Sequence, residues 1–181
     1  MKRSWRKARR ALGYVAATSA LLAGPAALPA SAHTAGGSHA VVTCVGGETI
    51  RLQPGLTLQA RHSRISGYAG YTCTGTDPEV KWAKSVIEGA GEASCLSLDS
   101  TAVEWITWNT GEHSRVFYRT HHLVEQLAGQ TVSLVEGRVV EGRFKGRTVA
   151  SPGLQLTLSP LDCATDRGVE AINGPTTLVF A

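Results

Sequence analysis

The clearest pattern along the chain is an alternation of apolar and polar residues from 116 to 124. In an extended strand, one face carries Val116, Tyr118, Thr120, His122 and Val124, and the other carries Phe117, Arg119, His121 and Leu123. A period of two is typical of a strand with one buried face. We therefore expect a half-buried β-strand here.

Similar short runs rich in Val, Thr, Ile, Tyr and Trp recur between turns rich in Pro, Gly and Asn, such as 53–55, 109–111 and 173–175. We predict strands, some of them merging, near 41–45, 48–52, 56–60, 68–74, 80–88, 93–98, 102–108, 115–124, 131–140, 144–149, 154–159 and 176–180. Strands at this spacing indicate an all-β fold, either an antiparallel β-sandwich or a partly closed β-barrel. Weak helix signals lie at 78–88 and 161–167.

Two tryptophans fall in the predicted strand 102–108. Trp105 shares a face with Val103 and Thr107, and Trp108 lies on the opposite face with Ile106. One tryptophan is expected in the core. The other is then a candidate for stacking on a sugar ring or docking on a partner, or is a second buried or strand-end aromatic side chain.

The first 32 residues differ from the rest and read as a cleavable signal peptide. Residues 2–10 hold six basic side chains and no acidic one, 11–28 are almost wholly apolar, and Ala30-Ser31-Ala32 is a small-x-small cleavage site. Arg9-Arg10 also allows a twin-arginine signal as the export route. We expect a signal peptide over 1–32, a flexible tail over 33–39, a single domain over 40–181, and no membrane span after cleavage.

Removal of this leader changes the charge. Six of the 18 Lys and Arg residues lie within it, so the remainder carries 12 basic and 14 acidic residues, a net charge of −2. The basic character of the precursor therefore does not indicate a nucleic-acid partner.

All four cysteines, Cys44, Cys73, Cys95 and Cys163, follow the leader. An even number in an exported chain predicts two disulfides, and the gaps of 29, 22 and 68 residues lack the short paired spacing of a zinc site. Three pairings are possible. We favour Cys44 with Cys73 and Cys95 with Cys163, and expect no metal.

Several of these segments together resemble a known group. The motifs are Thr43-Cys44, Pro54-Gly55-Leu56-Thr57-Leu58, Tyr71-Thr72-Cys73, Ser94-Cys95-Leu96-Ser97, Ile106-Thr107-Trp108-Asn109, Gly129-Gln130-Thr131-Val132, Gly142-Arg143-Phe144-Lys145-Gly146 and Cys163. In this order they resemble short exported four-cysteine β-proteins of actinobacteria, a largely uncharacterised group. The resemblance implies a secreted β-protein and carries over no functional residues.

Candidate chemistry is sparse. The chain has no G-x-S-x-G element, and oxidised cysteines have no thiolate, so we assign no catalytic residue and expect no cofactor. Histidines 113, 121 and 122 lie near carboxylates 104, 112 and 125, which leaves a metal or acid-base site as an alternative. Neighbouring strand residues face opposite ways, however, so His121 and His122 are poorly placed to share one ligand.

A Gly-rich hairpin is expected after 135–142, with Arg143, Lys145 and Arg147 at its tip. These cations are either simply solvated or contact an anionic cell-wall polymer. With Trp105 and Trp108 they are the candidate binding residues.

Because nothing here assembles a nucleophile, base and orienting group, the leading hypothesis is a secreted, non-enzymatic binding or structural module. Its expected partner is a cell-wall glycan or a secreted protein. A secreted hydrolase using a His and carboxylate site, and a secreted protease inhibitor presenting a loop near Cys73 or Cys95, are the alternatives.

Overall fold

The computed structural model describes residues 41–123, 125–127, 130–156 and 160–181, and in 121–134 and 152–160 it describes the backbone alone. The predicted signal peptide and tail lie outside this part of the chain. The elements are β1 (Val42–Leu56), β2 (Arg61–Gly75), β3 (Trp82–Ala93), β4 (Ser97–Trp108), β5 (His113–Leu123), β6 (Glu125–Leu127), β7 (Gln130–Gly142), β8 (Thr148–Leu156), α1 (Pro160–Cys163) and β9 (Val169–Phe180).

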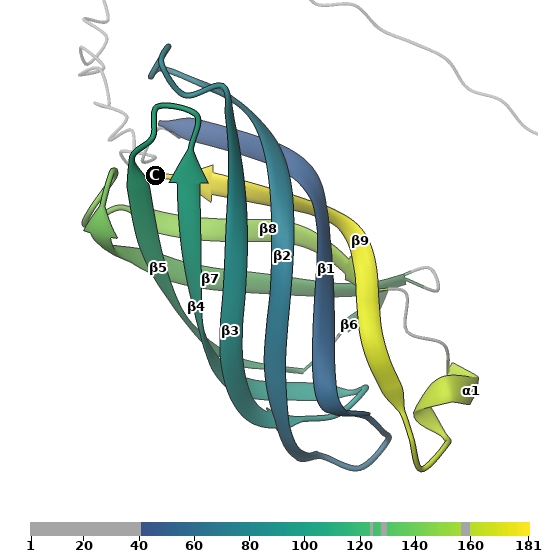
Figure 1. Ribbon diagram of the computed structural model, residues 1–181. Coiled ribbons are helices and arrows are strands. Elements are labelled where there is room, and N and C mark those ends of the chain that lie inside the picture. The colour runs from purple at the N-terminus through teal and green to yellow at the C-terminus, as the bar shows by residue number, and fades with distance from the viewer. Residues whose placement is uncertain (1–40, 124, 128–129, 157–159) are drawn as a thin grey trace, which may run out of the picture. The chain divides into compact units, whose positions relative to one another are not determined.

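These strands form a closed antiparallel barrel (Figure 1). Strands β1 to β5 follow one another in the sheet, β5 pairs with β7, and β9 returns to pair with β1. The short β6 pairs with β7 beyond the end of β5, so the ring itself has eight strands. The predicted all-β class is confirmed, and closure decides for a barrel over a sandwich.

The alternation predicted for β5 is confirmed and shows how the barrel is filled. Val116, Tyr118 and Thr120 are buried, and Phe117 and Arg119 are exposed. In a closed sheet the buried face of every strand points to the barrel interior. The same rule places one tryptophan of β4 inside and the other outside.

Several predicted boundaries were wrong. The runs 41–45 and 48–52 merge into β1, but the chain leaves the sheet after Leu56, so 56–60 is not a strand. The stretch 78–88 is not helical, because residues 82–93 alternate between the two faces of β3. The short helix expected at 161–167 is present as α1, at 160–163.

The predicted strand 144–149 begins only at Thr148, because the preceding residues turn the chain. Gly142, Phe144 and Gly146 all have positive φ, which extended strands do not allow. The sequence 143–147 is therefore the tip of the β7–β8 hairpin.

Two apolar clusters fill the two ends of the barrel. At the end near the C-terminus, the rings of Trp108, Phe144 and Phe180 pack with centroids 5.3 to 5.4 Å apart. At the other end Leu52, Leu56 and Ile172 pack around the second disulfide. Between these clusters lies the interior that carries the polar side chains described below.

The favoured disulfide pairing is confirmed. Cys44 and Cys73 face each other in the β1–β2 ladder, and Cys95 in the β3–β4 turn is bonded to Cys163 in α1. The first bridge joins strands that already pair. The second joins two connections that share no ladder.

Candidate functional site

The interior holds a buried carboxyl group on β4. Glu104 is only 2% exposed, and both of its oxygens accept hydrogen bonds from phenols. The Tyr71 hydroxyl on β2 donates to Oε1 at 2.9 Å, and the Tyr118 hydroxyl on β5 donates to Oε2 at 2.6 Å. Three strands thus meet at one carboxyl group.

Strand geometry forces Glu104 inward. It shares a face with Ile106 and Trp108, which are buried at 0% and 1% exposure, so its own side chain must enter the barrel. A buried carboxyl group is costly unless its hydrogen bonds are made, and the two phenols make them. Gly137 on β7, which pairs with Tyr118, gives that ring its space, since a Cβ there would lie 2.5 Å from a ring carbon.

Burial shifts the pKa values of this cluster upward. Burial raises the pKa of Glu104, and the neighbouring Ser85, Tyr118 and Tyr71 hydroxyls oppose this increase. Burial, followed by the Glu104 charge, also raises the pKa of both tyrosines. Both phenols therefore remain hydrogen-bond donors at any physiological pH.

A second carboxyl group, on β1, also enters the barrel. The pKa of Glu48 is raised to about 7. Burial is the main cause of this increase, a hydrogen bond with the Thr176 hydroxyl opposes it, and the Glu104 charge adds to it. Its Oε1 atom is buried and has no hydrogen-bond partner. Glu48 therefore has a buried oxygen that can still accept a hydrogen bond.

These groups border a cavity of ≈ 140 Å³. Glu48, Tyr71, Glu104 and Tyr118 contribute to its wall. Most of the remaining wall is aliphatic and includes Ile50, Leu52, Ile65, Ile87, Leu98 and Ile172. The described part of the wall contains no Lys, Arg or His side chain. The cavity therefore combines an apolar surface with an acidic polar side.

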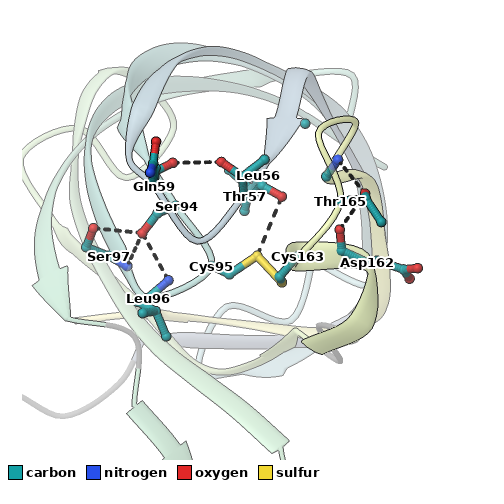
Figure 2. The surroundings of a disulfide bond; sticks show 12 residues. Leu56, Thr57, Gln59, Ser94, Cys95, Leu96, Ser97, Asp162, Cys163 and Thr165 are labelled. Carbon is teal, nitrogen blue, oxygen red and sulfur yellow. Dashed lines mark hydrogen bonds between the residues drawn. A yellow bond between two sulfur atoms is a disulfide. The ribbon is translucent and has the colours of Figure 1, made fainter.

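The barrel end beyond these aliphatic side chains is held by the Cys95–Cys163 disulfide (Figure 2). The β1–β2 loop contacts both halves of this bridge. Cys95 N donates to the Thr57 carbonyl at 2.9 Å, and Leu58 N donates to the Cys163 carbonyl at 3.1 Å. Cys95 Sγ lies 3.6 Å from the Leu56 carbonyl oxygen. Three connections are thereby fastened together across this end.

The two candidate tryptophans lie on opposite faces, as expected. Trp108 is a core residue whose Nε1 donates to Ser114 Oγ at 2.8 Å, so it offers no surface for a partner. Trp105 is 43% exposed on the outside of the barrel. It pairs with the exposed Val86, which pairs with the exposed Tyr68, so an apolar row crosses β2 to β4.

The hairpin cations are in different situations. Arg143 is 15% exposed and binds carboxylates of its own chain. It contacts Asp77 Oδ2 at 2.5 Å and Glu79 Oε2 at 3.3 Å, and it also pairs with Glu112. Lys145 and Arg147 are exposed at the hairpin tip. Arg143 therefore acts within the fold.

Only part of the predicted histidine and carboxylate group lies within the described structure. Glu104 is inside the barrel, Glu112 binds Arg143 in the β4–β5 turn, and His113 is exposed with Nδ1 3.3 Å from Thr107 Oγ1. The side chains of His121, His122 and Glu125 lie outside the described part. Among described residues, no three His, Cys, Asp or Glu side chains are grouped to hold a metal ion.

Sequence reasoning did not assign a role to Glu48, Tyr71 or Tyr118. One signal was present for Glu104, because it shares the face of Ile106 and Trp108 in the predicted strand. An acid on an apolar strand face indicates a buried polar site. No sequence signal showed that residues 48, 71 and 118 would meet it.

Comparisons with protein-family models, with curated proteins and with solved structures found no match for this chain. Within the described residues, no helix is both long and apolar enough to cross a membrane. Function must therefore be argued from the cavity and its surroundings.

Proposed function

We propose that the chain is an exported binding protein whose ligand is a small, largely apolar molecule held inside the barrel. The observation that carries this proposal is the ≈ 140 Å³ cavity with aliphatic walls and a polar side. Ligand sites are commonly apolar cavities with a few polar groups that orient the ligand. Eight-stranded barrels have an interior wide enough for side chains or for one small ligand.

The size of the cavity limits the ligand. A cavity of about 150 Å³ lined by aliphatic and aromatic side chains is known to take up benzene. A molecule of one ring, or a short branched chain, therefore fits the barrel without rearrangement.

Export supports the same proposal from another side. Two disulfides suit an oxidising compartment, and a leader with the features of a signal peptide precedes the domain. Glycan binding at Trp105, protease inhibition and hydrolysis through His121 or His122 stay predictions of the sequence.

The proposal is tested by titrating the purified oxidised protein with toluene and following methyl groups by NMR. Shifts and ligand contacts are expected at Ile50, Ile65 and Ile87, which line the cavity, with no change at Val45 and Val86 on the outside. Equal perturbation of both sets, or of neither, would contradict an interior site.

A matched pair of variants on β4 provides a control. Ala102 lines the cavity, and the neighbouring Thr101 is exposed on the outer face. Ala102→Leu is expected to fill the cavity and abolish toluene binding, while Thr101→Leu leaves it unchanged. The methyl contacts of the unmodified protein decide the question if Ala102→Leu does not fold.

A further inference from the structure

The cavity carries acidic groups without a counter-charge in its described wall. Glu48 and Glu104 border it, the other titratable groups there are Tyr71 and Tyr118, and the described wall has no basic side chain. Buried charges in proteins are normally paired, because an unpaired buried charge is costly. A bound molecule that brings a positive charge would supply the missing partner.

An open hydrogen-bond acceptor points to the same conclusion. Glu48 lines the cavity, and its Oε1 atom is buried without a hydrogen-bond partner. When ionised, this carboxylate lacks the partner that a buried charge normally has.

We infer that the ligand is a small organic cation, an apolar body with one primary ammonium group that binds Glu48 Oε1. This inference rests on the proposed function and specifies its ligand class. An ammonium group has three N–H donors and no acceptor, which matches a site whose open polar atom is an acceptor. The apolar body would lie against Ile50, Ile65 and Ile87.

A metal ion fits this site less well. Ca²⁺ takes six to eight oxygen ligands, and Mg²⁺ demands six in near-octahedral geometry. Both oxygens of Glu104 already accept from tyrosines, so Glu48 is the one carboxyl group of the described wall with an open oxygen. An anion would meet two carboxyl groups and, in the described wall, no positive charge.

Binding of a cation at Glu48 is coupled to its ionisation. The titratable groups that face Glu48 are Tyr71 on β2, Glu104 on β4 and Tyr118 on β5, while β9 contributes the Thr176 hydroxyl. The pKa of Glu48 is about 7, so the carboxylate form is the minority at pH 6 and the majority at pH 8. An ammonium ligand that needs the carboxylate should bind about tenfold more tightly at pH 8 than at pH 6.

The test is calorimetric titration of the oxidised protein with benzylamine, cyclohexanemethylamine and isoamylamine, each compared with the alcohol of the same shape. At pH 8 at least one amine is expected to bind about tenfold more tightly than its alcohol. At pH 6 this advantage should disappear. Benzoate should not bind.

Two variants separate the ligand class from the existence of the site. Glu48→Gln should remove the preference for the amine and its pH dependence and still bind the alcohol, whereas Glu88→Gln, on the outer face of β3, should change neither. Amines and alcohols that bind equally at both pH values would overturn the ammonium proposal and leave the interior site standing. Binding by none of the six would overturn both proposals.

Discussion

At the scale of single residues, the barrel places two carboxyl groups in an environment that favours their neutral form. Glu104 is satisfied by two phenols, and Glu48 retains an unpartnered buried oxygen. The Glu48 arrangement is not typical of a core built for stability alone, where buried polar groups are few and fully hydrogen-bonded. Such exceptions are common at functional sites.

Glu48 should therefore make stability depend on pH. Its pKa is raised from 4.5 in the unfolded chain to about 7 in the fold, so its favourable contribution is complete below pH 4.5 and is lost as the pH rises through 7. A shift of this size corresponds to roughly 3 kcal/mol at most. Denaturant unfolding should show lower stability at pH 8 than at pH 5, and a smaller difference in Glu48→Gln. An unchanged difference in the variant would show that Glu48 is not the group responsible.

At the scale of elements, one side chain fastens three turns at the barrel end near the C-terminus. Arg143 lies in the β7–β8 turn, Asp77 and Glu79 in the β2–β3 connection, and Glu112 in the β4–β5 turn. Hydrogen bonding to Arg143 is the main cause that lowers the pKa of Asp77. These turns surround the aromatic cluster of Trp108, Phe144 and Phe180 at the same end.

Loss of this contact should destabilise the fold. Arg143→Ala is expected to lower the free energy of unfolding by about 2 kcal/mol, because it leaves the partly buried Asp77 carboxylate without its partner and removes the link between three turns. Lys145→Ala, at the exposed tip of the same hairpin, should change it by less than about 0.5 kcal/mol. Urea unfolding at pH 7 measures both.

Because Asp77 has a lowered pKa, the effect of Arg143→Ala should shrink below about pH 3.8.

At the scale of the whole molecule, the two disulfides differ in what they hold together. Cys44–Cys73 crosses a ladder that already pairs β1 with β2, over 29 residues of sequence. Cys95–Cys163 spans 68 residues and joins the β3–β4 turn to α1, where no ladder connects the two. Loop-closure entropy gives about 3.6 kcal/mol for the shorter loop and about 4.4 kcal/mol for the longer one, a difference of roughly 0.8 kcal/mol.

Replacing each cysteine pair by alanine should reveal this difference. The variant without Cys95–Cys163 is expected to be the less stable one in urea unfolding, and to lose toluene binding, because that bridge fastens the barrel end beyond the cavity. The variant without Cys44–Cys73 should retain the cavity. If the variant without Cys44–Cys73 were the less stable one, the β1–β2 ladder would depend on its disulfide more strongly than the barrel end depends on Cys95–Cys163.

Local patterns were sufficient for much of the fold. Val116, Tyr118 and Thr120 on one face predicted a half-buried strand, and the odd spacing of Trp105 and Trp108 predicted their opposite faces. Both inferences depend only on the two-residue period of a strand. The helix signal at 78–88 failed because sheet pairing with β2 and β4 outweighed a weak local preference.

By itself the sequence determined the all-β class, the turns and which residues of each strand share a face, because these follow from neighbours along the chain. The tertiary structure decided that the sheet closes, since this depends on β9 pairing with β1. It also decided that Glu104 meets Tyr71 and Tyr118, and that Glu48 enters the same interior. The physical reason is that these contacts join residues far apart in the sequence, with separations from 14 to 124 positions among the hydrogen-bonded pairs. Such contacts depend on strand register, which the packing of the whole barrel sets.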